Sequence, residues 1–203
     1  MAHHVGPKAR INRRLGTSIY DSSGALRASH RRISPPGQHG LRRRRTSDYG
    51  RALMEKQKIC HYYGLSHRQL KRFFGLAKKM RGNTGQNLLL LCERRLDSVV
   101  WKAGFATTRS EARQAAAHGH LLVNGKRTKV PSCILSAEDV IQVRKRDNLQ
   151  KVYAARAESI DRPQPSFLAV EKKDLVIKMV DLPDTDDIGL TVNVNQVVEF
   201  LSR

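Results

Sequence analysis

A short helix that leads directly into a tight β-hairpin is predicted over Thr107–Val130, where the sequence reads TTRSEARQAAAHGHLLVNGKRTKV. Thr108 followed by Glu111 is typical of a capping box, in which side chains satisfy backbone N–H groups at the start of a helix. Gly119 supplies a left-handed residue that can end the helix. The dipeptide Asn124-Gly125 favours a two-residue hairpin turn, because both central residues of that turn need positive φ. The chain therefore combines helix with antiparallel sheet.

The predicted hairpin separates apolar from cationic side chains. A two-residue turn pairs Val123 with Lys126, and residues two apart on a strand share a face. On the preceding helix Arg109 and Arg113 are four residues apart and share a face. In an ordinary protein the charges of such a unit would simply face water. Whether they bind an anionic partner here therefore has to be judged from the charge of the rest of the chain. One face of the hairpin should be buried and holds Leu121, Val123, Thr128 and Val130, whereas the other holds His120, Arg127 and Lys129.

The charge of the chain is large and unevenly distributed. The 203 residues include 38 Lys and Arg against 18 Asp and Glu, for a formal net charge of +20. Residues 1–150 hold 31 of the basic and 9 of the acidic side chains, so the excess lies there. Such a surface repels itself and suits a polyanionic partner. Because no apolar run approaches the roughly 20 residues that span a bilayer, nucleic acid is favoured over a membrane.

The sequence does not indicate a metal, cofactor or catalytic site. The three cysteines, Cys60, Cys92 and Cys133, are far apart and odd in number, which suits small buried side chains in a reducing cytoplasm. The histidines lack neighbouring Cys or carboxylate residues at zinc-ligand spacing. No nucleophile motif or phosphate-binding loop is present, and the first ten residues lack the apolar core of a secretory signal. We expect a cytoplasmic protein without a cofactor that is not an enzyme.

The pattern along the chain predicts an α+β protein built from three parts. Residues 1–46 are predicted to be a basic extended arm, since they show few apolar side chains and no helical period. Residues 47–93 are predicted to be a small helical domain, with 188–203 forming a strand and an apolar end that pack back on it. Residues 94–187 are predicted to hold the helix–hairpin unit together with further strands and one more helix.

Within these parts the helices and strands are predicted from caps and periodicity. One helix follows Ser47, a second starts at Ser66 with Gln69 as its capping partner, and a third, longer helix carries Leu89 through Ala103. Strands are predicted over 140–143 and within 167–180, with a helix over 148–159. Aromatic side chains fall at helix-core spacing, so packing is favoured over base stacking for Tyr62, Tyr63, Phe73, Phe74 and Trp101.

Basic side chains outside the hairpin extend the predicted RNA-binding surface. A run of four arginines ends the arm, and three cations fall at i, i+3 and i+4 spacing on the second helix, opposite its apolar side. Contacts of this kind neutralise phosphates and position a protein without reading base sequence. The residues are Arg42, Arg43, Arg44, Arg45, Lys56, Lys58, Arg68, Lys71, Arg72, Arg94 and Arg95.

The chain resembles the bacterial-type small-subunit ribosomal protein S-four family. The namesake RNA-binding domain of that family is similar to Arg94–Arg146, notably in ERRLDSVVWKAGFATTRSEARQAAAHGHLLVNGKRTKVPS. PPGQHG, SDYGRALMEKQK and the terminal VVEFLSR resemble the whole protein rather than the domain alone. The resemblance runs from about Pro35 to the C-terminus.

The resemblance implies a structural role in the small ribosomal subunit. Members have an α-helical domain and an inserted RNA-binding domain, here residues 94–187, in which helices pack on an antiparallel sheet. They bind the small-subunit ribosomal RNA directly and early in assembly, at a multi-helix junction. With neighbouring ribosomal proteins they line the region where messenger RNA enters and influence decoding accuracy, and some repress their own translation, which makes messenger RNA a further candidate partner. By position, the family's RNA-facing residues correspond to Arg109, Arg113, Gln114, His118, His120 and Asn124, and Lys126 and Arg127 of the hairpin join that set.

Two positions depart from the family pattern. Many members carry four cysteines before the PPGQHG-like segment and hold zinc there, whereas this chain has no cysteine before Cys60. We therefore expect a zinc-free variant whose arm depends more on RNA for its order. The usual Pro-Gly-Asp turn before the 140–143 strand is replaced by Ser136-Ala137-Glu138-Asp139, so its turn type is open.

Two other function classes stay open from sequence. Pseudouridine synthases and some methyltransferases use a similar helix–hairpin unit as a guide, but they also need a catalytic domain that typically exceeds about 100 residues. A duplex-DNA-binding protein would need a recognition helix with Asn, Gln or Arg at base-reading spacing, and none is evident.

Overall fold

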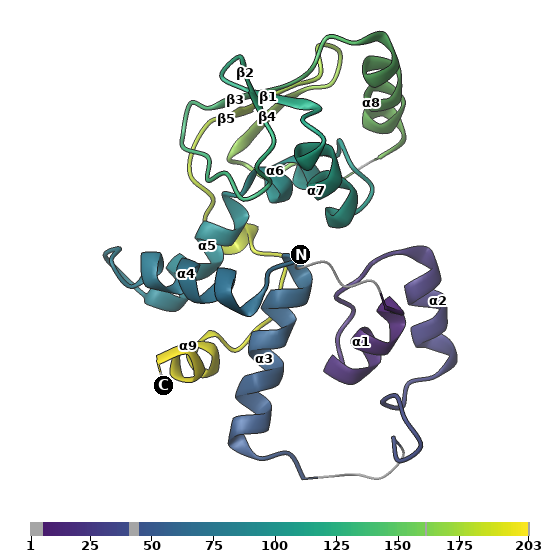
Figure 1. Ribbon diagram of the computed structural model, residues 1–203, viewed down its shortest axis with the longest axis vertical. Helices are drawn as coiled ribbons and strands as arrows, with labels where there is room; N and C mark the ends of the chain where they lie inside the picture. The colour runs from purple at the N-terminus through teal and green to yellow at the C-terminus, as the bar shows by residue number, and fades with distance from the viewer. Residues whose placement is uncertain (1–5, 41–44, 161, 203) are drawn as a thin grey trace. The chain divides into compact units, whose positions relative to one another are not determined.

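The computed structural model describes residues 6–40, 45–160 and 162–202 and has the predicted α+β fold (Figure 1). The chain divides into two compact units. The helical unit comprises residues 1–88 and 190–203, and the sheet unit comprises residues 89–189. Among the described residues, no helix has the length and apolar character needed to cross a bilayer.

The arm contains two helices where an extended segment was predicted. α1 (Lys8–Leu15) and α2 (Ser23–Arg31) pack against each other. The prediction was wrong because a few apolar residues suffice here: Ile11 and Leu15 lie one turn apart and are both buried. Buried Asn12 secures the turn after α1, since its side-chain oxygen accepts from the backbone N–H groups of residues 19 and 20 at 3.1 and 3.0 Å. The predicted contacts of Arg42, Arg43 and Arg44 lie outside the described residues.

The next two helices follow the sequence prediction. α3 (Asp48–Tyr62) begins after Ser47, whose hydroxyl accepts from a first-turn N–H group. α4 (His67–Ala77) begins with the predicted capping box between Ser66 and Gln69. The aromatic side chains Tyr62, Tyr63, Phe73 and Phe74 are all buried. They pack in the protein interior, as predicted, and are not exposed for stacking on bases.

The predicted long third helix is two helices, α5 (Thr84–Glu93) and α6 (Leu96–Lys102). The break falls at Arg95, which has extended dihedral angles and pairs with Ile134 in an isolated antiparallel bridge. Its side chain is fully buried and donates to both carboxylate oxygens of Asp97. A buried ion pair and a tertiary bridge thus interrupt a pattern that is helical by local periodicity.

The sheet unit is a five-stranded antiparallel sheet covered by helices (Figure 1). The strand order is β2-β1-β3-β5-β4. The helices α6, α7 and α8 share one core with the inward side chains of the sheet. After α6 the unit continues with α7 (Arg109–Ala117), β1 (Leu121–Val123), β2 (Lys126–Thr128), β3 (Val140–Val143), α8 (Asp147–Ser159), β4 (Leu168–Glu171), β5 (Val176–Met179) and the 3-10 turn η1 (Thr185–Asp187).

The predicted hairpin is confirmed in register and turn. Val123 pairs with Lys126, and Asn124 and Gly125 both have positive φ, at 50° and 76°. Leu121 is fully buried, as expected. Val130 is 55% exposed rather than buried, because β2 ends at Thr128 and the chain then leaves the sheet.

The C-terminal segment forms α9 (Val194–Ser202) instead of the predicted strand. Asn193 favours the helix because its side-chain oxygen accepts from the N–H group of Gln196 at 3.4 Å, an N-cap interaction. α9 packs on α3 within the helical unit. The Asn193 N–H group donates to Glu55 of α3 at 2.9 Å, and the rings of Tyr49 and Phe200 lie 5.5 Å apart.

Candidate nucleic-acid interface

A cationic groove of about 560 Å³ lies in the sheet unit where the end of α7, β2, the segment after β3 and the start of α8 meet. Three sequence segments that are distant along the chain supply its charged side chains. Asp147 is the only acid among its lining residues. The lining comprises His118, His120, Arg127, Arg144, Lys145, Arg146, Asp147, Asn148 and Leu149.

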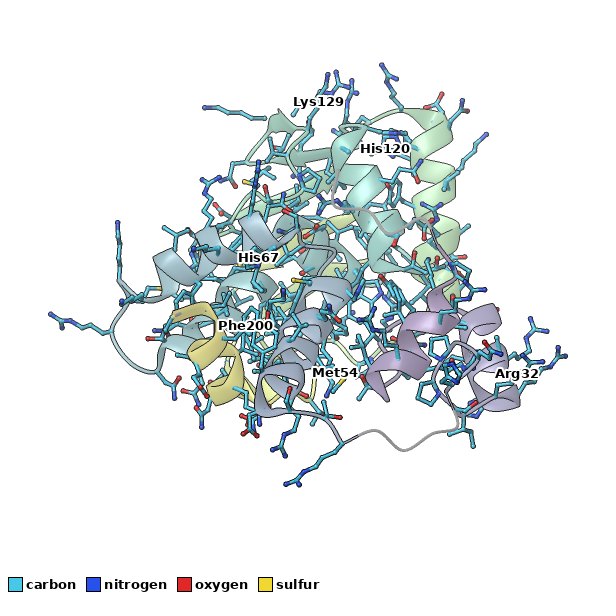
Figure 2. All side chains as sticks on the ribbon, turned by 60° about the horizontal axis from the view of Figure 1, so that its bottom comes forward. Arg32, Met54, His67, His120, Lys129 and Phe200 are labelled. Atoms are coloured by element: carbon cyan, nitrogen blue, oxygen red, sulfur yellow. The ribbon has the colours of Figure 1, made fainter. Side chains whose placement is uncertain are left out.

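His120 is a half-buried residue in the lining of this cationic groove. The side chain of His120 is labelled in Figure 2. Its Nδ1 lies 3.2 Å from the hydroxyl of Tyr153, and its ring packs edge-on against the ring of His118 with centroids 5.7 Å apart. Burial lowers the pKa of His120 below its usual 6.5, and the charges of His118, Arg156, Arg144 and Arg127 lower it further. The imidazole is therefore held neutral near pH 7 when the groove holds only water.

Arginine side chains tie the backbone of the groove together. The Arg127 guanidinium donates to the carbonyl of His118 at 3.3 Å, and the Arg144 guanidinium donates to the carbonyl of Gly119 at 3.4 Å. The backbone N–H group of Arg144 donates in addition to the carbonyl of His120 at 2.9 Å. Gly119 lies between His118 and His120 and has a φ of 67°. A side chain at this position would approach the Arg127 guanidinium to 2.6 Å. Glycine is needed at this position both for its backbone conformation and for the space it leaves.

Arg109 and Arg113 lie elsewhere, against the interior of the sheet unit. The Arg109 guanidinium stacks on Trp101 at 4.1 Å, donates to the Ser98 hydroxyl at 3.0 Å and lies 3.6 Å from the buried carboxylate of Glu93. Arg113 pairs with Asp97 at 3.3 Å. The predicted helix face therefore meets acids and an aromatic ring of its own domain, and its contact with RNA stays a prediction.

Arg94 and Arg95 also differ from the expected exposed pair. Arg95 is fully buried, so its predicted place on the basic surface is wrong. A guanidinium that is removed from water needs a carboxylate partner, which Asp97 provides. Arg94 is partly exposed and donates to the carbonyl of Leu135 at 2.8 Å.

In the helical unit the predicted stripe on α4 is exposed as expected, with Arg68, Lys71 and Arg72 all facing solvent. The two lysines of α3 are only partly exposed. Lys58 pairs with Glu55 at 2.6 Å, and the ammonium of Lys56 lies 5.0 Å from the centre of the Phe200 ring.

The remaining predicted residues differ in their surroundings. Gln114, Lys126 and Arg45 are exposed. Asn124 is exposed too, but its side chain accepts from the Val140 N–H group at 2.9 Å and so fixes the hairpin against β3.

The structure adds cations that the predicted set omitted. Arg144, Lys145 and Arg146 line the groove, and their signal was present in the sequence as a basic run directly after the 140–143 strand. Exposed arginines also extend from α1 and α2, as Arg32 does beyond the end of α2 (Figure 2). The arm was predicted to be extended, so no RNA-binding surface was assigned to its residues before Arg42.

Comparison with known proteins identifies the family. The model of the Ribosomal protein S4/S9 N-terminal domain matches residues 3–93, and the model of the S4 domain matches residues 94–141. The small ribosomal subunit protein uS4 of Rhodopirellula baltica is 51% identical over 203 residues, which cover the whole of both chains. The chain belongs to the uS4 family.

Other uS4 proteins match with similar completeness. Those of Roseiflexus castenholzii and Persephonella marina are 41% and 40% identical, and each alignment covers the full length of both chains. The resemblance stated from sequence is thereby confirmed. Three of the nine residues that line the groove lie within the region that matches the S4 domain, and the other six follow shortly after it.

Proposed function

We propose that this uS4 protein is a structural, non-enzymatic component of the small ribosomal subunit that binds the small-subunit ribosomal RNA directly. The observation that carries the proposal is the cationic groove, in which Arg127, Arg144, Lys145 and Arg146 face a single acid. Phosphate groups are the ligands that such a groove suits, because each contact releases condensed counterions. The names of the relatives, all small ribosomal subunit proteins, support the RNA as the partner.

The exposed stripe on α4 supplies a second cationic surface for the same polymer. Its three cations lie on one helix face, with the apolar side of the helix buried. Two separate cationic surfaces on one chain can hold two RNA segments at once, and the second contact then forms at high effective concentration. Such a clamp favours the assembled geometry of the RNA, which supports roles in nucleating the subunit body and, with neighbouring ribosomal proteins, in decoding accuracy.

The direct test is the salt dependence of binding between the full chain and the small-subunit ribosomal RNA. Replacing Arg127 and Arg146 by Gln should weaken binding and lower the slope of log K against log salt by up to about one unit for each lost contact. The matched control is Lys172→Gln with Lys173→Gln, which removes the same charge from the exposed turn between β4 and β5 of the same unit. Equal slopes for the two double variants would contradict the groove as the binding site.

The rival function, guidance of an RNA-modifying enzyme, predicts transient rather than stable association. Co-sedimentation separates the two, because a structural protein accompanies the small subunit in a one-to-one ratio. Recovery of the chain only in ribosome-free fractions would overturn the structural role.

A further inference from the structure

We propose that the backbone phosphates of RNA occupy the cationic groove and that His120 gains a proton when they bind. The inference rests on the proposed function and adds a linkage between RNA binding and pH. Four observations carry it: the size of the groove, the position of His120, its charged neighbours and the scarcity of acids in the lining.

The groove is large enough for a segment of RNA backbone. Its volume of about 560 Å³ lies within the roughly 300–1,000 Å³ that is common for small-ligand sites, and it exceeds what one small ion fills. The cations reach it from β2 and from the segment between β3 and α8. A chain with one negative charge per nucleotide matches such a distribution better than a single anion does.

His120 can change its protonation state without losing its place. Nδ1 lies 3.2 Å from the Tyr153 hydroxyl, which is able to accept as well as donate a hydrogen bond. Tyr153 is almost fully buried on α8, so the contact holds the imidazole at the wall of the groove. Neutral and protonated rings can therefore occupy the same position.

The surroundings of His120 make the neutral ring the resting form. His118 faces it from the end of α7, Arg127 from β2 and Arg144 from the segment after β3. From α8 it is faced by Tyr153, by Arg156 and, across the lining, by the single acid Asp147. Arg156 is paired with Glu111 of α7, so that carboxylate already has a cationic partner.

Bound phosphates reverse the sign of the local charge. Burial and neighbouring cations hold the pKa of His120 below 6.5 in the free protein, and phosphates within hydrogen-bond distance would raise it. At a pH between the pKa of His120 in the free protein and its pKa in the complex, the complex holds more protons than the separate molecules do. Affinity must therefore rise as pH falls, by at most about tenfold per pH unit for one linked proton.

Calorimetry of the full chain with the small-subunit ribosomal RNA tests this directly. Titrations between about pH 6 and 8, at constant salt and in buffers of different ionisation enthalpy, count the protons taken up. The wild-type chain should take up a fraction of one proton and bind several-fold more tightly at the acidic end. His120→Gln, which keeps a polar side chain but cannot titrate, should lose that uptake and show a flatter pH profile. The control His30→Gln removes an exposed imidazole of α2 and should behave as wild type.

Two further measurements keep the outcome unambiguous. Unfolding followed by the fluorescence of Trp101, the only tryptophan, shows whether His120→Gln remains folded. If that variant does not fold, the ring NMR signals of His120 in the wild-type chain give the same answer, because RNA should move their titration midpoint upward. Inorganic phosphate at the same concentration should leave the midpoint unchanged, which separates RNA backbone from a lone anion.

The outcomes distinguish the two proposals. Tight RNA binding with no proton uptake, or with equal uptake in wild type and His120→Gln, overturns the linkage and leaves the proposed function intact. Absence of binding to ribosomal RNA at every pH overturns both.

Discussion

The side-chain amide of Asn124 donates a hydrogen bond of 2.8 Å to the carboxylate of Asp139, and this contact joins the tip of the β1–β2 hairpin to the turn before β3. Family resemblance assigned Asn124 to the RNA-facing motif. In the structure the same side chain also accepts a hydrogen bond from the Val140 N–H group at 2.9 Å. The Asn124 side chain therefore links the hairpin turn to the start of β3.

Replacing Asn124 by Ala should destabilise the sheet unit. The variant loses both side-chain hydrogen bonds and places a Cβ-bearing residue without a local polar contact at a φ of 50°. We expect a loss of about 1–2 kcal/mol in the free energy of unfolding, measured by denaturation with Trp101 fluorescence. Asn124→Gly keeps the backbone freedom and isolates the hydrogen-bond contribution, so it should lose less. Unchanged stability in both variants would contradict this link.

Glu138 holds a conformation that glycine adopts more easily. Its φ is 69°, in the position where the family usually has glycine, and its carboxylate forms an exposed ion pair with Lys178 at 2.9 Å. Glu138→Gly should be more stable than Glu138→Ala by about 1 kcal/mol, because both lose the carboxylate but only glycine relieves the backbone strain. The comparison of their denaturation midpoints tests this. Equal midpoints would show that the turn relaxes around alanine.

Replacing Arg109 should mainly affect stability, whereas replacing Arg127 should mainly affect RNA binding. Arg109→Ala removes the stack on Trp101 and a partner of buried Glu93, so it should lower stability by about 2 kcal/mol and change Trp101 fluorescence. Arg127→Ala should weaken RNA binding with little change in stability, because Arg127 is exposed. A conservative Arg109→Lys control keeps the charge but loses the planar stack. If Arg109→Ala reduces RNA affinity at full stability, the predicted RNA contact is supported instead.

Gly85 should resist substitution because of α9. An added Cβ would meet the Val194 side chain at 2.0 Å and the Val198 side chain at 3.2 Å. Gly85→Ala should therefore destabilise the helical unit by about 1–3 kcal/mol, measured by circular dichroism during denaturation. Val194→Ala in the same chain opens space and should recover part of the loss. No recovery in the double variant would mean that the loss of stability does not come from the contact with Val194.

The ionised carboxylate of Glu111 should stabilise the folded protein near neutral pH and lose this effect in acid. Burial opposes its ionisation, but hydrogen bonds from Thr107 and the charge of Arg156 outweigh burial and lower its pKa below 4.5. Because the folded pKa lies below the unfolded one, the stabilisation is complete above about pH 4.5 and disappears as the pH falls through the folded pKa. Urea denaturation between about pH 6 and 3 should show a steeper loss for wild type than for Glu111→Gln. Parallel profiles would contradict this role.

Interactions between residues close in sequence were predictable. The capping residues Ser66 and Gln69 and the Asn124-Gly125 turn appear in the structure as the sequence indicates. Each depends on atoms only a few residues apart, so the same contacts form whatever the remainder of the fold does. Thr108 is an intermediate case: it caps α7 through the Glu111 N–H group at 3.2 Å, but the Glu111 carboxylate also accepts from the N–H group of Thr107, at 2.7 Å.

Local sequence patterns were enough to predict the α+β class, the positions of most helices and strands, the cationic character of the chain and, through its motifs, its family. Which cations are available to RNA depends instead on tertiary packing. Arg95 is enclosed with a carboxylate and Arg109 is stacked on an aromatic ring, whereas Arg144 and Arg146 line an open groove. The accessibility of an arginine depends on how the whole unit packs around it, as when the distant segment at Ile134 bridges to Arg95, and no local pattern contains that information.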